Sequence, residues 1–129
     1  MTNFDAGEAE NRASALLAKT AQQLQDILEL VARRLRPFPS FQGMTTVQAV
    51  EVEPGFSSAR DLGCVVVDPD GRLCSLEITA ISGIAGMAEA DQVEQFQPLD
   101  LSSEEYIVYA SAAIALLSDE LRRRGGRGT

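Results

Sequence analysis

The stretch that decides the fold is LGCVVVDPDGRLCSLEI, residues 62–78. Two runs rich in aliphatic and β-branched residues flank a four-residue turn sequence, a pattern that predicts a β-hairpin. Pro69 fixes φ for the first central position of a type I turn, and Gly71 can adopt the left-handed conformation that follows. A three-residue loop of this kind places Asp68 opposite Arg72.

In this register Val66 lies opposite Cys74, and the side chains divide between two faces. The face expected to pack on helices carries Leu62, Cys64, Val66, Cys74, Leu76 and Ile78. The other face is apolar near the turn and polar further along, and its apolar part is Val65, Val67 and Leu73. We therefore expect these three side chains on an outer surface, where the following segment or a partner covers them.

A long amphipathic helix is predicted before the hairpin. Asp5 and Glu8 have capping-box spacing, and Pro37 ends the helix because proline lacks the N–H that continues the ladder. Steps of three and four residues trace an apolar seam through Leu17, Ala21, Leu24, Leu28, Val31 and Leu35. On one side the seam is widened by Leu16, Ile27 and Leu30.

This predicted helix is longer than the domain that carries it. About 31 residues give roughly 45 Å of helix, whereas a compact chain of this size is roughly 36 Å across. The N-terminal end therefore either overhangs the domain or frays. An overhanging amphipathic end suits a partner helix, including that of a second copy.

A second helix is predicted near the C-terminus. Ser102 and Glu105 have capping-box spacing, and Gly125-Gly126 is expected to end the helix before a disordered tail at residues 125–129. Between Tyr106 and Leu117 the side chains are apolar or small apart from one serine, which predicts a helix buried on most sides.

The remaining elements complete an α+β domain over residues 1–124. The valines of residues 45–53 are typical of a strand, and residues 87–96 are expected to form a short acidic helix that ends before Pro98. Within residues 84–101 the pattern leaves helical and irregular structure open. The predicted fold is a long helix, a three-stranded antiparallel meander, this segment and a buried helix, with a single layer of helices on one sheet face.

Charge is unevenly distributed along the chain. The formal net charge is −8, and residues 51–120 hold fourteen acidic and two basic residues, a net charge of −12. Two groups of arginines lie near the predicted helix ends: Arg33, Arg34 and Arg36, then Arg122, Arg123, Arg124 and Arg127. The acidic surface favours solubility or a basic protein partner. Nucleic-acid binding requires the opposite, a clustered positive surface.

Familiar catalytic and metal-binding motifs are missing from the sequence. The chain has no histidine, which removes the usual general base near neutral pH and a common metal ligand. Cys64 and Cys74 cannot hold zinc alone, and their diagonal placement favours two buried free thiols over a disulfide. The turn DPDG lacks the other ligands of a calcium loop, and residues 82–86 lack the lysine of a phosphate loop. We expect no catalytic residue, metal or cofactor.

The expected function is non-enzymatic. The sequence favours an assembly factor, adaptor or small subunit that binds another protein or a second copy of itself, without binding nucleic acid or inserting into a membrane. The candidate interface consists of Leu16, Ile27, Leu30, Val65, Val67 and Leu73. The alternative is a small-molecule-binding or regulatory domain with a pocket between sheet and helices. The acidic N-terminus lacks an apolar segment, so a cytoplasmic location is the default expectation.

Overall fold

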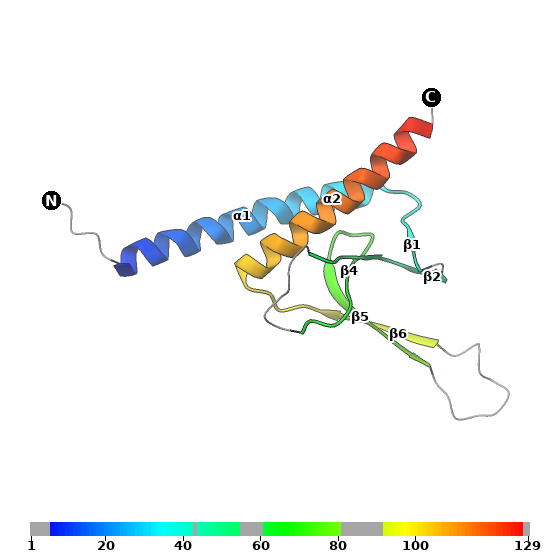
Figure 1. Cartoon of the computed structure of the whole chain (residues 1–129), viewed down its shortest axis with the longest axis horizontal. Helices are drawn as coiled ribbons and strands as arrows, with labels where there is room; N and C mark the ends of the chain where they lie inside the picture. Colours follow the sequence, from blue (N-terminus) through cyan, green and yellow to red (C-terminus); the bar gives the residue numbers. More distant parts are fainter. Residues whose placement is uncertain (1–5, 43, 55–60, 81–91, 128–129) are drawn as a thin grey trace.

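A computed structural model describes residues 6–42, 44–54, 61–80 and 92–127 (Figure 1). Helix α1 (Ala6–Arg34) precedes the strands, and helix α2 (Ser103–Arg127) follows them. The first sheet pairs β1 (Ser40–Phe41) with β2 (Met44–Gln48). The second sheet has four antiparallel strands in the order β3 (Val50–Glu51), β4 (Val65–Val67), β5 (Leu73–Ala80) and β6 (Gln92–Pro98). The predicted α+β class is confirmed.

The β4–β5 hairpin has the predicted register, with Val66 opposite Cys74 and Val67 opposite Leu73. This agreement follows from the turn, since the loop length of a hairpin determines which residues pair.

The turn itself is held by four hydrogen bonds. The backbone N–H of Asp68 donates to the carbonyl of Arg72 at 3.0 Å, and that of Gly71 donates to the carbonyl of Asp68 at 2.9 Å. The Asp68 carboxylate accepts from the backbone N–H groups of Asp70 and Arg72, each at 2.9 Å. Gly71 has the expected left-handed conformation, with φ of +82°.

Residues 92–98 form a strand, and this differs from the predicted acidic helix. Strand β6 pairs with β5 along its length, from Ala80 opposite Gln92 to Cys74 opposite Pro98. The long free edge of β5 offers backbone partners that a weak local helix preference cannot match. The meander therefore has a fourth strand. The rest of the predicted helix, residues 87–91, lies outside the described residues.

Helices α1 and α2 lie side by side and run in the same direction (Figure 1). The core seam of α1 is confirmed, because Leu28 and Leu35 are fully buried while Leu24 and Val31 pack against the same cluster. With 29 residues, α1 is about 43 Å long. Its N-terminal end extends past the start of α2, so the described helix overhangs the domain (Figure 1). Asp5 of the predicted cap lies outside the described residues.

Helix α2 starts where the sequence predicts, but it ends later than predicted and its outer side is more exposed than predicted. The N–H of Ser102 donates to the Glu105 carboxylate at 3.0 Å, and the N–H of Glu105 donates to the Ser102 hydroxyl at 3.1 Å, which forms the capping box. The helix continues through the expected stop at Gly125 to Arg127. Its inner side is buried at Tyr109, Ala110, Ala113 and Leu117. Its outer side is open, with Ser111, Ala115 and Leu116 exposed.

Next to the turn, the two faces of the hairpin are reversed relative to the prediction, whereas Leu62 packs on the helix cluster as predicted. Val65, Val67 and Leu73 pack against the helices, in a cluster that includes Leu28, Tyr109 and Leu117. Val66, Cys74 and Leu76 instead pack with Phe41, Val47 and Ala49 from the segment containing the β1–β2 hairpin. Both faces of the hairpin are apolar, so alternation alone does not show which of them meets the helices.

Gly71 is required where the hairpin turn meets α1. A Cβ atom on Gly71 would lie 2.7 Å from the Cα atom and 2.9 Å from the N atom of Glu29. We expect Gly71→Ala to lower the free energy of unfolding by about 2 to 4 kcal/mol, from the positive φ and the backbone clash together. Urea unfolding measures this loss. Gly125→Ala is the control, because a Cβ there meets nothing within 4 Å; equal stability of both variants would contradict the close contact.

Candidate functional site

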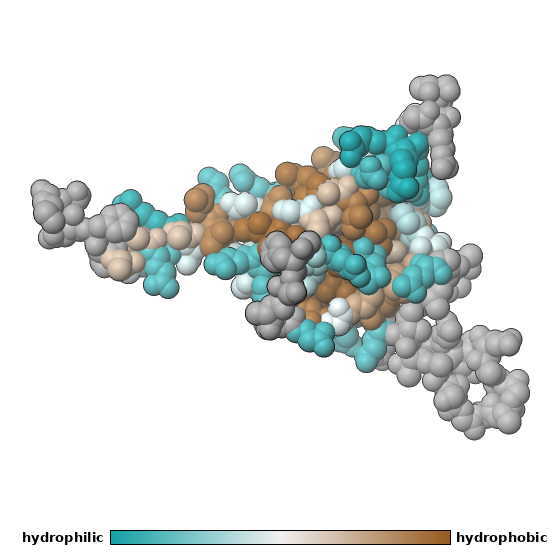
Figure 2. Space-filling view, in the orientation of Figure 1, coloured by the Kyte–Doolittle hydropathy of each residue, from teal (hydrophilic) through white to brown (hydrophobic). Residues whose placement is uncertain are grey.

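Three large apolar side chains of α1 point away from the core. Leu16 is 65% exposed, Ile27 45% and Leu30 54%. Leu16 and Ile27 are separated by about three helical turns, and Leu30 follows one turn later, so the three share one side of the helix. We call these three residues the α1 patch. Hydrophobic residues are visible over both helices in Figure 2.

The other half of the predicted interface lies in the core. Val65 is 3% exposed, Val67 0% and Leu73 8%, all beneath the helices. The structure therefore does not bring the six predicted residues together. The α1 patch remains on the surface, and the three sheet residues are unavailable to a partner in this fold.

Two further exposed apolar side chains were missed from the sequence. Leu116 on α2 is 42% exposed and Phe96 on β6 is 39% exposed. The exposure of Leu116 follows from the apolar sequence of α2. A helix that is apolar on all sides and packs against the domain on one side leaves apolar side chains exposed on its other side. Phe96 lies in the segment for which the sequence predicts a helix, and its exposure follows from its place on strand β6.

The two groups of arginines meet at one end of the molecule. Arg124 near the end of α2 donates to the carbonyl of Pro37, just beyond α1, at 2.6 Å. The basic end comprises Arg33, Arg34, Arg36, Arg122, Arg123 and Arg124. Asp119 and Glu120 pair with the arginines of α2 at distances between 3.3 and 4.0 Å. Arg36 also donates to the carbonyl of Pro69 at 3.4 Å, between Asp68 and Asp70, so carboxylates of the hairpin turn lie at this end as well.

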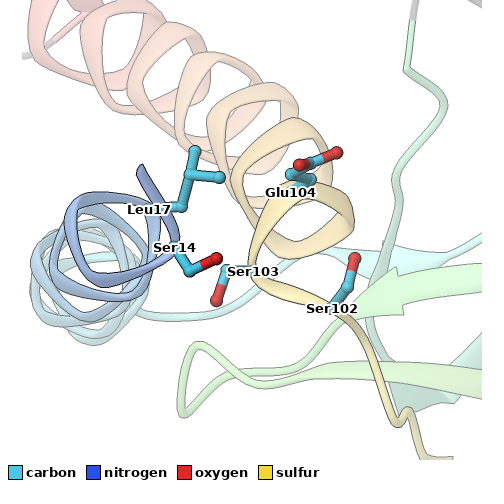
Figure 3. Close-up of a pocket in the computed structure, with 5 residues that line it drawn as sticks. All are labelled: Ser14, Leu17, Ser102, Ser103 and Glu104. Atoms are coloured by element: carbon cyan, nitrogen blue, oxygen red, sulfur yellow. The ribbon is translucent and has the colours of Figure 1, made fainter. Parts of the chain in front are cut away.

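An open cavity of about 320 Å³ lies between α1 and the start of α2 (Figure 3). It is lined by Ser14, Leu17, Ser102, Ser103 and Glu104. The sequence-based alternative expected a pocket between the sheet and the helices. This cavity instead lies between the two helices. The lining combines hydroxyl groups, one carboxylate and one apolar side chain, a set without a cation or a basic partner for a hydroxyl nucleophile.

Cys64 and Cys74 are free thiols. The carbonyl of Cys64 accepts from the N–H of Leu76 at 2.8 Å, and Cys74 lies opposite Val66, so the cysteines are diagonal neighbours as predicted. Burial raises the pKa of both thiols; Glu51 and Glu53 raise the pKa of Cys64 further. For Cys74, the carboxylate of Asp68 adds to the rise and Arg72 opposes it. A raised pKa lowers the thiolate fraction at neutral pH.

Tyr106 is the third group with a perturbed pKa. It lies half-buried at the edge of the helix core. Burial, followed by the nearby carboxylates of Glu29 and Asp26, raises the pKa of Tyr106 to about 12. All three shifts favour the neutral side chain, the opposite of what activates a nucleophile.

We also compared the chain with known proteins and looked in the described residues for a metal site and a membrane-spanning helix. Across the described ranges, no three Cys, Asp or Glu side chains lie close enough together to hold a metal ion. Neither of the two described helices has an apolar stretch long enough to cross a membrane. No known family model matches the chain, and no curated protein or solved structure is significantly similar to it.

We expect both thiols to react slowly with iodoacetamide in the folded protein at neutral pH. Cys74 is buried and Cys64 half-buried, so Cys74 should be the slower of the two. Because the pKa of each is raised, the rate should keep increasing above the pH at which an exposed thiol has levelled off. Labelling in urea is the control, and mass spectrometry identifies the modified residue. Fast native labelling of Cys74 would exclude the buried position.

Tyr109→Phe leaves Tyr106 as the sole tyrosine of the chain. Ultraviolet titration of the folded variant should give a midpoint of about 12, and in denaturant the midpoint should return to about 10. Since the folded state holds the neutral phenol, its contribution to stability is complete below about pH 10 and is lost as the pH rises toward 12. A folded-state midpoint near the ordinary value would show that Tyr106 is solvated.

Proposed function

We propose that this protein is a non-enzymatic interaction module, an assembly factor, adaptor or small subunit, that binds another protein through the outer side of α1. The observation that carries this proposal is the α1 patch, in which Leu16, Ile27 and Leu30 are 45% to 65% exposed along one side of a helix. The sheet face considered with it from the sequence lies under the helices, so α1 alone supplies the surface.

Burial of the α1 patch by a partner is favourable. Fully burying one leucine or isoleucine side chain contributes about 1.5 to 3 kcal/mol. About half of each of these three side chains is still exposed, so a partner can bury that remaining area. Apolar anchors of this kind, surrounded by polar side chains, are typical of the centre of a protein interface. Lys19, Gln23 and Asp26 supply polar groups beside the patch, and all three are exposed.

The C-terminal half of α1 is also a rigid support. Leu28 and Ala32 are fully buried on the inward side of the same turns, and Leu35 is buried just past the helix end. A partner that binds Ile27 and Leu30 therefore does not have to order the helix first. This reduces the entropy lost on binding, which otherwise offsets much of the gain from buried area.

The cavity between the helices supports the alternative of a small-molecule-binding or regulatory domain less well. Ligand sites are lined mainly by apolar and aromatic side chains with a few polar groups that orient the ligand. This cavity is lined mainly by polar side chains, since Leu17 is the one apolar residue beside three serines and Glu104. The exposed apolar surface of α1 is the stronger of the two features.

Site-specific photo-crosslinking tests the proposed function. A photoreactive amino acid replaces Ile27 in cells of the source organism, and matched proteins carry it at Ala18, an exposed position half a turn around the helix. We expect a discrete crosslinked protein from position 27 and none from position 18. Crosslinks that are absent at position 27, or equal at both positions, would exclude binding through the α1 patch.

A further inference from the structure

The charged side chains that border the α1 patch are mostly basic. On a helix, the surface neighbours of a residue are those three and four positions away. By this spacing, the charged neighbours of the patch are four cations and one anion: Arg12, Lys19, Arg33, Arg34 and Asp26. All five are exposed. A net charge of +3 therefore borders the patch, in a chain whose net charge is −8.

Two of these five side chains already have partners on α1. Arg12 pairs with the carboxylate of Glu8 at 2.8 Å, one turn before it. The carboxylate of Asp26 accepts from the amide of Gln22 at 3.3 Å. The one acidic neighbour of the patch is thus engaged within its own helix.

The other three cations are open to a partner. In the part of the chain that the structure describes, the side chains of Lys19, Arg33 and Arg34 make no hydrogen bond or ion pair. Glu29 is one turn before Arg33, but its carboxylate accepts from the amide of Gln25 at 3.5 Å instead. The unpaired charges at the border of the patch are therefore all positive.

The acidic groups of the elements that pack on α1 are placed elsewhere. Asp119 and Glu120 pair with arginines of α2 at distances between 3.3 and 4.0 Å. Glu104 lines the cavity between α1 and the start of α2. Asp68 and Asp70 belong to the hairpin turn that contacts α1. The first two are neutralised locally, and the other three lie where α2 and the hairpin meet α1.

The patch and its open cations form a narrow strip. Leu16 and Leu30 are separated by roughly 21 Å along the helix. Lys19 lies within this length, and Arg33 and Arg34 lie one turn beyond its end. Apolar anchors spaced along a helix are typical of surfaces that bind an amphipathic segment of another protein.

The net charge of the chain favours a narrow partner over a broad anionic one. A membrane surface or a nucleic-acid duplex would face the acidic remainder of the protein as well as the strip, and residues 51–120 alone carry −12. Repulsion from these residues opposes binding to a broad anionic surface. A single protein segment contacts only one side of α1.

We propose that the partner is an amphipathic segment of another protein, whose apolar side chains cover the α1 patch and whose carboxylates face Lys19, Arg33 and Arg34. This inference rests on the proposed function and specifies the chemistry of the partner. The apolar side chains supply most of the affinity. The carboxylates select the partner and speed its association, because exposed ion pairs each contribute little to affinity.

Two synthetic helical peptides test this chemistry. Each is about three heptads long with leucine at the apolar positions, and the flanking positions carry glutamate in one peptide and lysine in the other. Fluorescence anisotropy measures their binding to the purified full chain. We expect the glutamate peptide to bind about tenfold more tightly, since ion pairs replace like-charge contacts at three positions. The net charge of −8 favours the lysine peptide, so a preference for glutamate reports the local border of the patch.

Three variants locate the binding surface. Arg34→Glu should weaken binding of the glutamate peptide about threefold, and Ile27→Glu should abolish binding of both peptides. Arg122→Glu is the charge-matched control and should bind like the unmodified chain. Arg122 follows the buried Ala113 by nine positions, so it projects from the outer side of α2. Far-UV circular dichroism and urea unfolding confirm that each variant is folded.

The outcomes separate this inference from the proposed function. Equal affinity for both peptides, or tighter binding of lysine, would overturn the acidic partner, while loss of that binding in Ile27→Glu would still support the proposed function. Binding to phosphatidylserine vesicles, or a dimer of this chain, either of them lost in Ile27→Glu, would identify a different occupant and overturn the inference. If neither peptide binds, the inference also fails, and the crosslink from position 27 decides the proposed function separately.

Discussion

The turn at Gly71 approaches the backbone of α1 so closely that no side chain fits between them. The rest of the arrangement depends on this contact, because it fixes the distance and the rotation of the β4–β5 hairpin relative to the helix. Val67 and Leu73 are then directed beneath the helices, where they join Leu28 in the main cluster. The alternate residues face the other way and are covered by side chains around the β1–β2 hairpin.

The packing of α2 and the hairpin on α1 leaves one side of this helix exposed. Leu28 and Ala32 are fully buried, whereas Ile27 and Leu30 project from a different side of the same turns and are exposed. One helix thus carries two seams with different roles: the inner seam stabilises the domain and the outer one is available to a partner. The distinction is physical, since a side chain already buried in its own core has little area left to contribute to binding.

Burial and nearby carboxylates together raise the pKa of Cys64, Cys74 and Tyr106. The perturbed thiols and Tyr106 are held in their neutral forms, which is consistent with structural positions. The charges that remain available are on the surface, with arginines where the two helices end and acidic groups along most of the chain. Such a distribution orients partners and excludes wrong orientations more than it adds to affinity.

Local patterns by themselves determined the hairpin register, the core seam of α1, the capping box of α2 and the diagonal thiols, because each depends on spacing within a few residues. They also placed Leu16, Ile27 and Leu30 beside that seam. Only the tertiary structure decided which hairpin face meets the helices, since both faces are apolar. Strand β6 and the meeting of Arg124 with Pro37 join segments far apart in the chain, and local spacing carries no information about such contacts.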